Sequence, residues 1–344
     1  MTIKIGILGA GSVGCYLAGS LLNGARNAGR ENVAVSLLGR AYMGEQLAAY
    51  GLTISDFRGL NRHFSGDQFD FSDDAEIMAD ADFLLVTVKS SASADLAQQI
   101  RPYLKPGAQV ISIQNGVGNA EALAAALPGV DVLPGMIAFN VLQRGEGRFH
   151  AGTDGAVMVQ RSAATQKLEK CFLGSGLRFE LQDDMQAVLW SKLLLNLNNS
   201  INALAGVPLK EELSQRGYRQ CLSLLQTEAL RAISAAGIPL IQLSGVPAKM
   251  MPRLLKVPDF LFKLLAQKML AIDPLARSSM WEDLERGRIT EVDWLNGEVV
   301  KLAQKQGLDA LANRRIIALI RAAEQGGRRD FSGPELLSLL KGRE

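Results

Sequence analysis

Three polar side chains recur at helical spacing within an intensely apolar stretch of the sequence. Lys192, Asn196 and Asn199 stand at positions i, i+4 and i+7 of a segment otherwise dominated by leucine. This spacing places them on one face of an α-helix. A polar stripe on a buried helix costs free energy unless it lines a wet cleft or finds polar partners. The stripe therefore indicates a ligand cleft, a structural hydrogen-bond network or a face exposed to solvent.

A lysine in an apolar cleft can act as a proton donor, because burial disfavours the ammonium and lowers the lysine pKa. Histidine is the more common acid, but the chain contains only His63 and His150, both in β-rich segments away from the stripe. Lys192 is therefore the candidate general acid, with Asn196 and Asn199 as nearby amide donors.

A glycine-rich hexapeptide near the N-terminus predicts a dinucleotide site. It consists of Gly9, Ala10, Gly11, Ser12, Val13 and Gly14. It follows an expected strand and precedes an expected helix. In this context the first glycine permits a tight turn, the second lets the backbone approach a pyrophosphate, and the third lets helix and strand pack closely. The phosphates would lie at the positive N-terminus of the helix. A glycine turn without a ligand is the alternative.

The residue that follows the second expected strand distinguishes the two nicotinamide cofactors. An acidic residue there would bind the ribose 2′-hydroxyl of NAD, but this chain has Arg40. A guanidinium can donate two parallel hydrogen bonds to a 2′-phosphate. The sequence therefore favours NADP(H), unless Arg40 is only a solvated surface residue. A nicotinamide would supply a hydride, so the proton donor Lys192 suits the reduction of a ketone.

Lys89 and Asn115 follow two further expected strands. Ligands of an open α/β sheet bind outside the carboxyl ends of its strands. Both side chains are therefore aimed at the ligand crevice by topology, although either could be a solvated loop residue.

The elements that would position these residues divide the chain in two. Short apolar runs at residues 3–8, 33–38, 83–88, 110–113 and 132–133 alternate with helical stretches, which is typical of parallel strands covered on both faces. Residues 52–71 predict a small hairpin excursion, and residues 147–160 are again β-rich. From about residue 184 the apolar spacing becomes helical, with one long helix marked by Leu189, Leu193, Leu197 and Leu204. We expect a Rossmann-type, doubly wound parallel sheet over 1–184 and an all-α domain over 185–344.

The bulk composition limits the function classes. At 344 residues two domains are expected, and a net charge of +2 gives no field that implies a nucleic-acid or membrane partner. The three cysteines lie far apart, so neither a disulfide framework nor a metal site is expected. No apolar run has membrane-spanning length, and the N-terminus lacks the features of a signal peptide. These features favour a cytoplasmic protein with a small-molecule ligand.

Four blocks of the sequence resemble the ketopantoate reductases (2-dehydropantoate 2-reductases). They are residues 9–14, 86–89, 114–118 and 190–193. A later pair of blocks, 278–283 and 290–297, looks like the C-terminal signature of that family. This pair is the most specific part of the resemblance. The resemblance covers nearly the whole chain in the same order.

The resemblance implies NADPH-dependent reduction of 2-dehydropantoate to (R)-pantoate, a step toward pantothenate and coenzyme A. It implies that Lys192 is the general acid, that Glu291 binds the substrate hydroxyl and that Ser279 contacts the substrate carboxylate. It also implies that Asn196 binds substrate and that Asn115, with Lys89 beside it, serves the cofactor and substrate side of the cleft. Without the resemblance, Glu291 is a first-turn acid after Thr290, and Ser278-Ser279 is an ordinary helix cap.

The chain departs from the family pattern at three places, one of which is an extra Gly- and Asn-containing stretch over residues 23–32. The family often has an asparagine where this chain has Ser200, and Asn199 is the possible substitute. Residues 245–273 are long and unusually apolar, so they could reshape the substrate pocket or form an oligomer contact, such as that of a homodimer.

Three alternatives remain open. A relative of the family could reduce another small 2-keto acid. A Rossmann-plus-helical dehydrogenase of phosphorylated polyols or sugar acids would need an anion clamp, for which Arg277, Arg286 and Arg288 are available. A non-catalytic NADP(H)-sensing module would bind the cofactor without turnover.

Overall fold

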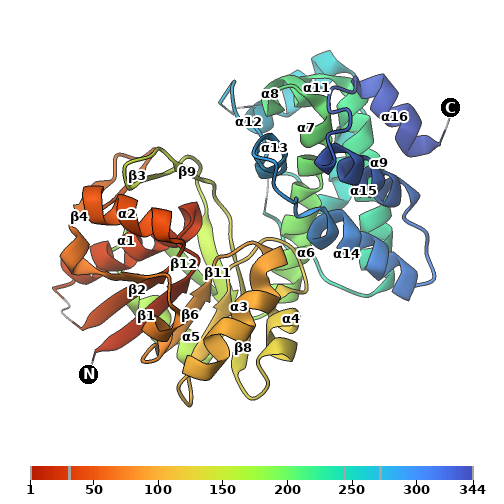
Figure 1. Ribbon diagram of the computed structural model, residues 1–344. Helices are drawn as coiled ribbons and strands as arrows, with labels where there is room; N and C mark the ends of the chain where they lie inside the picture. Colours follow the sequence, from red (N-terminus) through yellow and green to blue (C-terminus); the bar gives the residue numbers. More distant parts are fainter. Residues whose placement is uncertain (1, 30–31, 244, 271–272, 343–344) are drawn as a thin grey trace. The chain divides into compact units, whose positions relative to one another are not determined.

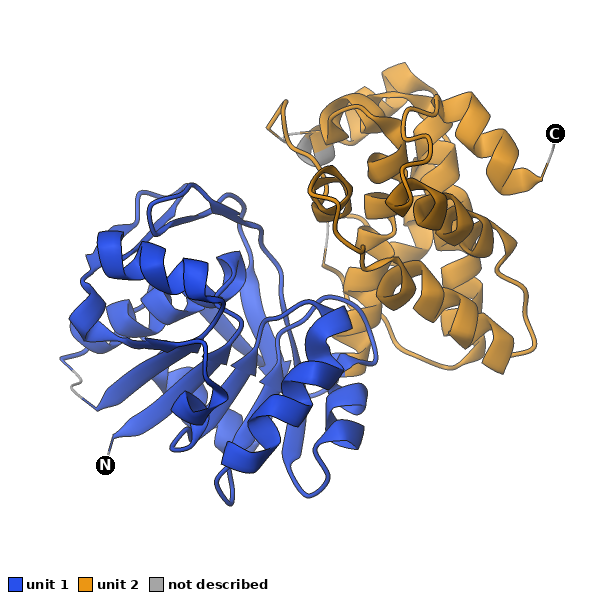
Figure 2. Ribbon diagram, in the orientation of Figure 1, with its two compact units in different colours: residues 1–185 blue, residues 186–344 orange. Residues whose placement is uncertain are grey.

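The computed structural model describes residues 2–29, 32–243, 245–270 and 273–342 (Figure 1). The chain forms two compact units, residues 1–185 and residues 186–344 (Figure 2). The first unit is built around β-sheets and the second from helices, which confirms the predicted α/β and all-α fold classes.

The main sheet of the first unit has eight strands in the order β12-β11-β8-β7-β6-β1-β2-β5. Their bounds are β1 (Ile3–Leu8), β2 (Val33–Leu38), β5 (Asp70–Ser72), β6 (Phe83–Val86), β7 (Gln109–Ser112), β8 (Asp131–Ile137), β11 (Ala156–Gln160) and β12 (Arg178–Gln182). The six strands from β5 to β8 are parallel, but β11 runs antiparallel to β8 and β12 runs parallel to β11. The sheet is therefore doubly wound, as predicted, with two reversed strands at one edge.

Helices cover both faces of this sheet, which explains the continuous apolar runs. Ile5 and Ile7 of β1 pack in a core with α1 (Ser12–Asn27), α2 (Ala41–Tyr50) and α5 (Ala163–Cys171). Leu84 and Val86 of β6 face the other way, into a core with α3 (Ser93–Ile100) and α4 (Asn119–Ala126). Successive side chains of a strand point to opposite faces, so both must be apolar when both faces are buried.

A second, four-stranded sheet has the order β4-β3-β10-β9. β3 (Leu52–Asp56) and β4 (Asn61–Phe64) form the predicted hairpin, and β9 (Val141–Gln143) and β10 (Arg148–Ala151) join it. The predicted β-rich stretch 147–160 is therefore shared between two sheets, because β10 lies in this one and β11 in the main sheet.

The second unit consists of helices and the short turns between them. The longer helices are α6 (Met185–Asn196), α7 (Asn198–Ala205), α9 (Arg216–Ala235), α14 (Val292–Lys305), α15 (Leu311–Glu324) and α16 (Gly333–Lys341). The shorter ones are α8 (Leu209–Ser214), α10 (Met251–Leu254), α11 (Asp259–Leu265), α12 (Gln267–Leu270) and α13 (Ser279–Glu285). Within the described part of the chain, no helix combines the length and apolar character of a membrane span.

The predicted single long helix over Leu189–Leu204 is wrong, because the chain forms two consecutive helices with Leu197 between them. The hydroxyl of Ser200 donates a hydrogen bond to the Leu197 carbonyl over 3.0 Å. Such a side-chain bond competes with the helical ladder and bends or interrupts it. Lys192 and Asn196 therefore lie on α6, whereas Asn199 lies on α7.

The apolar segment 245–273 contains α10, α11 and α12, and its residues 271 and 272 lie outside the described part of the chain. Phe262 of α11 is fully buried beneath the guanidinium of Arg219, 4.2 Å from its ring centroid. Phe260 and Leu264 are instead exposed, at 76% and 66%. The segment is therefore anchored by one face of α11, while the other face is apolar and exposed.

Candidate active site

The three glycines of the turn between β1 and α1 have different surroundings. Gly9 has φ +116°, a conformation that other residues rarely adopt. A Cβ on Gly14 would lie 2.1 Å from the Gly9 carbonyl oxygen and 2.8 Å from Thr87 Oγ1. A Cβ on Gly11 would meet no atom within 4 Å. The first and third glycines are therefore required by the protein itself, whereas the space in front of Gly11 is open.

The N-terminus of α1 has the properties of an anion site. Gly11 is its N-cap residue, supplies no side-chain cap, and no acidic residue lies in the first turn. Ala10 is buried, whereas Ser12 and Val13 are partly exposed at the start of the helix. The first backbone N–H groups of a helix have no intrahelical acceptor and attract negative charge. The turn therefore fits the pyrophosphate of a dinucleotide.

Arg40 follows directly on β2, beside the glycine turn. The backbone N–H groups of Gly9 and Ala10 both donate to the Leu38 carbonyl over 3.0 Å, which joins the turn to the end of β2. Arg40 is exposed and makes no ion pair with any other described residue. Its guanidinium is thus available for a phosphate near the turn.

Lys89 and Asn115 are partly exposed in the loops that follow β6 and β7. The buried Gln114 joins these loops, because its Nε2 donates to the Val88 carbonyl over 2.9 Å. Asn119 Nδ2 donates to the Asn115 carbonyl over 2.7 Å and fixes the second loop from α4. The structure therefore brings together the two loops that topology predicted would be neighbours.

Lys192 lies on α6 and is largely buried, with a part of the residue still exposed. Burial lowers its pKa below the ordinary lysine value. Among the described residues its ammonium has no hydrogen-bond or ion-pair partner, and the Asn196 side chain on the next turn has no hydrogen-bond partner either. An unpaired ammonium with a depressed pKa is suited to proton donation.

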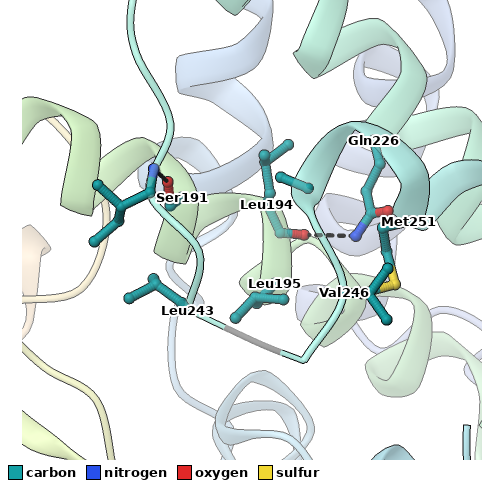
Figure 3. Close-up of a pocket in the computed structure, with 9 residues that line it drawn as sticks. Ser191, Leu194, Leu195, Gln226, Leu243, Val246 and Met251 are labelled. Atoms are coloured by element: carbon teal, nitrogen blue, oxygen red, sulfur yellow. Dashed lines mark hydrogen bonds between the residues drawn. The ribbon is translucent and has the colours of Figure 1, made fainter.

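Contacts with α9 and with the segment that follows α9 fix the position of α6 (Figure 3). Gln226 of α9 points toward α6, and its Nε2 donates to the Leu194 carbonyl over 3.0 Å. The backbone N–H of Ile241 donates to Ser191 Oγ over 2.9 Å. These residues line a small, mostly apolar cavity with Leu195. The cavity belongs to the anchoring of α6 in the second unit.

Ser278 and Ser279 have separate roles at the start of α13. Ser278 is buried and caps the helix, because its Oγ accepts from the Trp281 backbone N–H over 3.1 Å. The same hydroxyl donates to the Asn199 carbonyl over 3.2 Å. Ser279 is exposed. The interpretation as an ordinary cap is therefore right for Ser278, and Ser279 remains available to a ligand.

Glu291 is the N-cap residue of α14 and is partly exposed, but its side chain makes no capping hydrogen bond. The neighbouring Thr290 accepts from the Val292 backbone N–H over 3.3 Å and is itself bound to Glu324. Glu291 is therefore not required to cap the helix.

A buried network behind Ser278 was missed by the sequence analysis. The Ser278 N–H donates to Asn202 Oδ1 over 2.8 Å, and Asn202 Nδ2 donates to Glu212 Oε2 over 2.7 Å. Glu212 is fully buried, and burial raises its pKa to about 8 although hydrogen bonds from Asn202 and Asn198 oppose this. Glu212 Oε1 has no hydrogen-bond partner among the described residues. When the carboxyl is protonated, it carries a proton that it can donate.

The only sequence signal for this network was the run of asparagines from 196 to 202, which reads as polar without showing which members are structural. The structure separates them. Asn202 is fully buried in the network, whereas Asn196 and Asn199 are partly exposed.

The three arginines considered as an anion clamp have different surroundings. Arg277 stacks 4.6 Å from the Trp281 ring centroid. Arg286 pairs with Glu282 over 3.7 Å, and Arg288 is exposed. These contacts do not bring the three guanidinium groups onto one partner.

No three histidine, cysteine or carboxylate side chains gather as metal ligands within the ranges that the structure describes. Cys15, Cys171 and Cys221 are each buried, and none of the three forms a disulfide bond.

Two family models match consecutive parts of the chain. The one described as "Ketopantoate reductase PanE/ApbA" matches residues 5–163, and "Ketopantoate reductase PanE/ApbA C terminal" matches residues 184–324. A 2-dehydropantoate 2-reductase of Halobacterium salinarum is 28% identical over 334 residues, 94% of this chain and 100% of that protein.

Solved structures of similar chains extend the comparison. The PanE/ApbA family ketopantoate reductase of Ralstonia eutropha has a TM-score of 0.79 at 27% identity, covering 94% of this chain and 99% of its own. A D-mandelate dehydrogenase with NADH and anilino(oxo)acetate has a TM-score of 0.76 at 20% identity, over 94% and 99%. A dimeric ketopantoate reductase of Staphylococcus aureus has a TM-score of 0.70 at 19% identity, over 94% and 99%. The last two show likeness of fold alone.

Proposed function

The chain belongs to the ketopantoate reductase family, and from this membership we propose that it reduces 2-dehydropantoate to (R)-pantoate with NADPH, toward pantothenate and coenzyme A. It is an oxidoreductase that uses a nicotinamide cofactor, as the family does. NADPH as the cofactor and 2-dehydropantoate as the substrate are the parts that we propose.

The observation that carries the proposal is the state of Lys192. A buried lysine with a lowered pKa and no partner among the described residues is costly unless it has a chemical use. Reduction of a ketone provides that use, since the carbonyl oxygen becomes an alkoxide that must be protonated.

The proposed roles follow from the chemistry of each side chain. A reduced nicotinamide, when bound, supplies the hydride. The Lys192 ammonium donates its proton to the alkoxide oxygen. Glu291 accepts a hydrogen bond from the substrate hydroxyl, and Ser279 donates to the substrate carboxylate. Amides of Asn115 and Asn196 orient the substrate.

Cofactor binding is proposed for the first unit, over residues 1–184, and substrate binding for residues 185–344. The hexapeptide 9–14 would bind the pyrophosphate at the N-terminus of α1, and Arg40 would bind the 2′-phosphate. Lys89 would lie beside Asn115 on the cofactor side. Asn199 is the weaker candidate for substrate, because its carbonyl already accepts from Ser278 and its helix begins after the break at Leu197.

The proposed setting is cytoplasmic, and the proposed assembly is a homodimer. The dimeric state of the Staphylococcus aureus relative supports the latter. Sedimentation equilibrium would test it, since a dimer has twice the chain mass of 37.0 kDa.

The decisive experiment follows oxidation of NADPH and NADH with a panel of keto compounds. The panel contains 2-dehydropantoate, other branched 2-keto acids and phosphorylated keto compounds. We expect the highest kcat/KM for 2-dehydropantoate with NADPH. A higher kcat/KM for another 2-keto acid would identify that acid as the substrate in place of 2-dehydropantoate. Tight NADPH binding without any turnover would overturn the catalytic proposal.

A further inference from the structure

A wide groove in the second unit gathers cationic side chains that the proposed reaction does not use. It has a volume of about 1220 Å³ and is lined by the end of α9, the segment that follows it, and α10. Arg231 comes from α9, Lys249 and Arg253 from the α10 region, and Lys256 from the turn after α10. Among the residues that the structure describes, no carboxylate lines this groove.

The acidic residues nearest in sequence are bound elsewhere. Glu228 accepts hydrogen bonds from the backbone N–H groups of Ala312 and Asn313, over 2.8 and 3.0 Å. Asp259 pairs with Arg219 over 2.9 Å. The four groove cations themselves make no ion pair within the described residues. The groove therefore carries four uncompensated positive charges on a chain whose net charge is only +2.

The C-terminus of α9 does not account for these cations. Basic side chains often lie near a helix C-terminus because its last carbonyls are unpaired. Here the Ala236, Gly237 and Ile238 N–H groups donate to the carbonyls of Ala232, Ser234 and Ile233, over 3.0, 3.2 and 3.1 Å. The helix end is capped by its own backbone.

The groove also has an apolar floor, which includes Ile233, Ile238, Leu240, Pro252 and Leu308. A concave surface with an apolar floor and a few charged groups is typical of small-molecule sites, and its volume exceeds that of sites for drug-sized ligands. A cleft of one charge sign concentrates ligands of the opposite sign. Two arginines favour phosphate, because a guanidinium can bind two of its oxygens at once.

We propose that this groove binds a phosphorylated organic anion, with two or more phosphate charges on the cationic side chains and an aromatic or apolar body on the floor. The site lies wholly within the second unit. It shares no lining residue with the glycine turn or with the residues proposed for catalysis.

The test measures binding of a fluorescent N-methylanthraniloyl ADP to the full-length protein without NADPH, because NADPH carries phosphates and aromatic rings and would itself enter the proposed groove. The same titration of Gly11→Ala, in which the proposed dinucleotide site is blocked, gives the share of saturable binding that belongs to the groove. The double variant Arg231→Gln/Arg253→Gln should weaken this binding at least about tenfold. The control Lys305→Gln/Lys341→Gln removes the same charge from exposed lysines that do not line the groove. It should leave the affinity unchanged within about twofold.

Three results would overturn the proposal: no saturable binding to Gly11→Ala, equal weakening by both double variants, or binding only to phosphatidylglycerol vesicles and not to the nucleotide. Thermal unfolding of both variants checks that they fold, which is expected because the substituted side chains are exposed. Because the readout is binding rather than turnover, its failure is distinct from failure of the proposed reductase activity.

Discussion

Lys192 illustrates how one buried side chain can concentrate the chemistry of a site. Its pKa is lowered by burial, and none of the described residues compensates its charge. Arg40, in contrast, is exposed, and its guanidinium is available to bind a phosphate. The two residues therefore make separable predictions, one for the chemical step and one for the choice of cofactor.

Replacing Lys192 with alanine should lower kcat by about 10²- to 10⁴-fold, the usual contribution of a general acid. NADPH affinity should stay unchanged. In the unaltered enzyme kcat/KM should fall as pH rises through the Lys192 pKa, because only the ammonium can donate a proton. Since burial lowers that pKa, the fall should begin below pH 10.5. Steady-state kinetics across pH would measure both effects, with Lys210→Ala as the exposed-lysine control. Turnover within a few-fold of normal in Lys192→Ala would exclude the proposed role.

Arg40→Ala should raise the KM for NADPH about ten- to hundredfold while changing the KM for NADH less than twofold. The loss corresponds to one charged hydrogen-bond pair to the 2′-phosphate. Arg26→Ala removes an equal charge from an exposed position on α1. Equal changes for the two cofactors, or a matching change in the control, would argue against a 2′-phosphate contact.

The strand–turn–helix β1–Gly9–α1 shows how one element can combine structural and binding requirements. Gly14 lies so close to Gly9 that the helix could not pack on the strand with a side chain there. Gly11 has no such neighbour. The same substitution at these two glycines should therefore have different consequences.

Gly14→Ala should destabilise the protein by about 1–3 kcal/mol, because its Cβ would lie 2.1 Å from the Gly9 carbonyl oxygen. Gly11→Ala should cost less than about 1 kcal/mol, the scale of a change at an N-cap. It should nevertheless weaken NADPH binding more than tenfold by standing where the pyrophosphate approaches. Urea unfolding and equilibrium binding would separate the two. Normal NADPH affinity in Gly11→Ala would contradict this placement of the cofactor.

Glu212 of α8 links three helices, since Asn202 of α7 bonds both to it and to the residue that caps α13. With a folded pKa of about 8, Glu212 stays protonated when folded at pH values where the unfolded chain ionises it. Its stabilisation is therefore fully present below the ordinary glutamate pKa and is lost as pH rises toward 8. The slope is at most about 1.4 kcal/mol per pH unit.

Glu212→Gln cannot ionise, so its unfolding free energy should decline less than that of the unaltered protein between pH 5 and 8. Urea unfolding at several pH values measures the difference. The neighbouring Glu211 is exposed, so Glu211→Gln should leave the pH profile unchanged. Parallel profiles for Glu212→Gln and the unaltered protein would refute the raised pKa.

The whole molecule distributes the proposed functions over two compact units. The first contains the glycine turn and Arg40, and the second contains Lys192, Ser279 and Glu291. The helical unit also contains the groove proposed for a phosphorylated anion, in addition to the residues proposed for catalysis. Fold class follows from local apolar patterns along the chain, whereas each of these sites depends on particular contacts.

NADPH should stabilise the protein by an amount that rises with the logarithm of its free concentration above the Kd. At a free concentration one hundred times its Kd, the unfolding free energy should rise by about 2.7 kcal/mol. With an affinity more than tenfold weaker, Gly11→Ala should show a rise of at most about 1.4 kcal/mol at the same NADPH concentration. Chemical denaturation with and without NADPH measures this. An equal rise in the variant would place the binding elsewhere.

The sequence was sufficient where the information is local. Apolar runs predicted the strands, the change to helical spacing predicted the second unit, and the glycine pattern predicted the turn. It also placed Lys89 and Asn115 on neighbouring loops, because parallel strands end at the same edge of a sheet. Ser279 and Glu291 came from the resemblance, since their spacing alone reads as ordinary helix capping.

The prediction from helical periodicity was wrong at Leu197. There one helix ends and the next begins, and the Ser200 hydroxyl donates to the Leu197 carbonyl. Apolar spacing continues through the break, so pattern alone predicts a single helix. It equally failed to show that β11 reverses direction, because a buried strand has the same apolar run in either orientation.

Composition, periodicity and short motifs by themselves determined that this is a two-part oxidoreductase with a dinucleotide turn. These signals are carried by residues close together in the chain, so they survive without knowledge of packing. Only the tertiary structure decided which polar groups lack partners. The network from Ser278 to Glu212 joins residues up to 76 positions apart, and the cationic groove unites α9 with segments beyond it. Burial and unpaired charge depend on what packs around a side chain, and no local pattern specifies that.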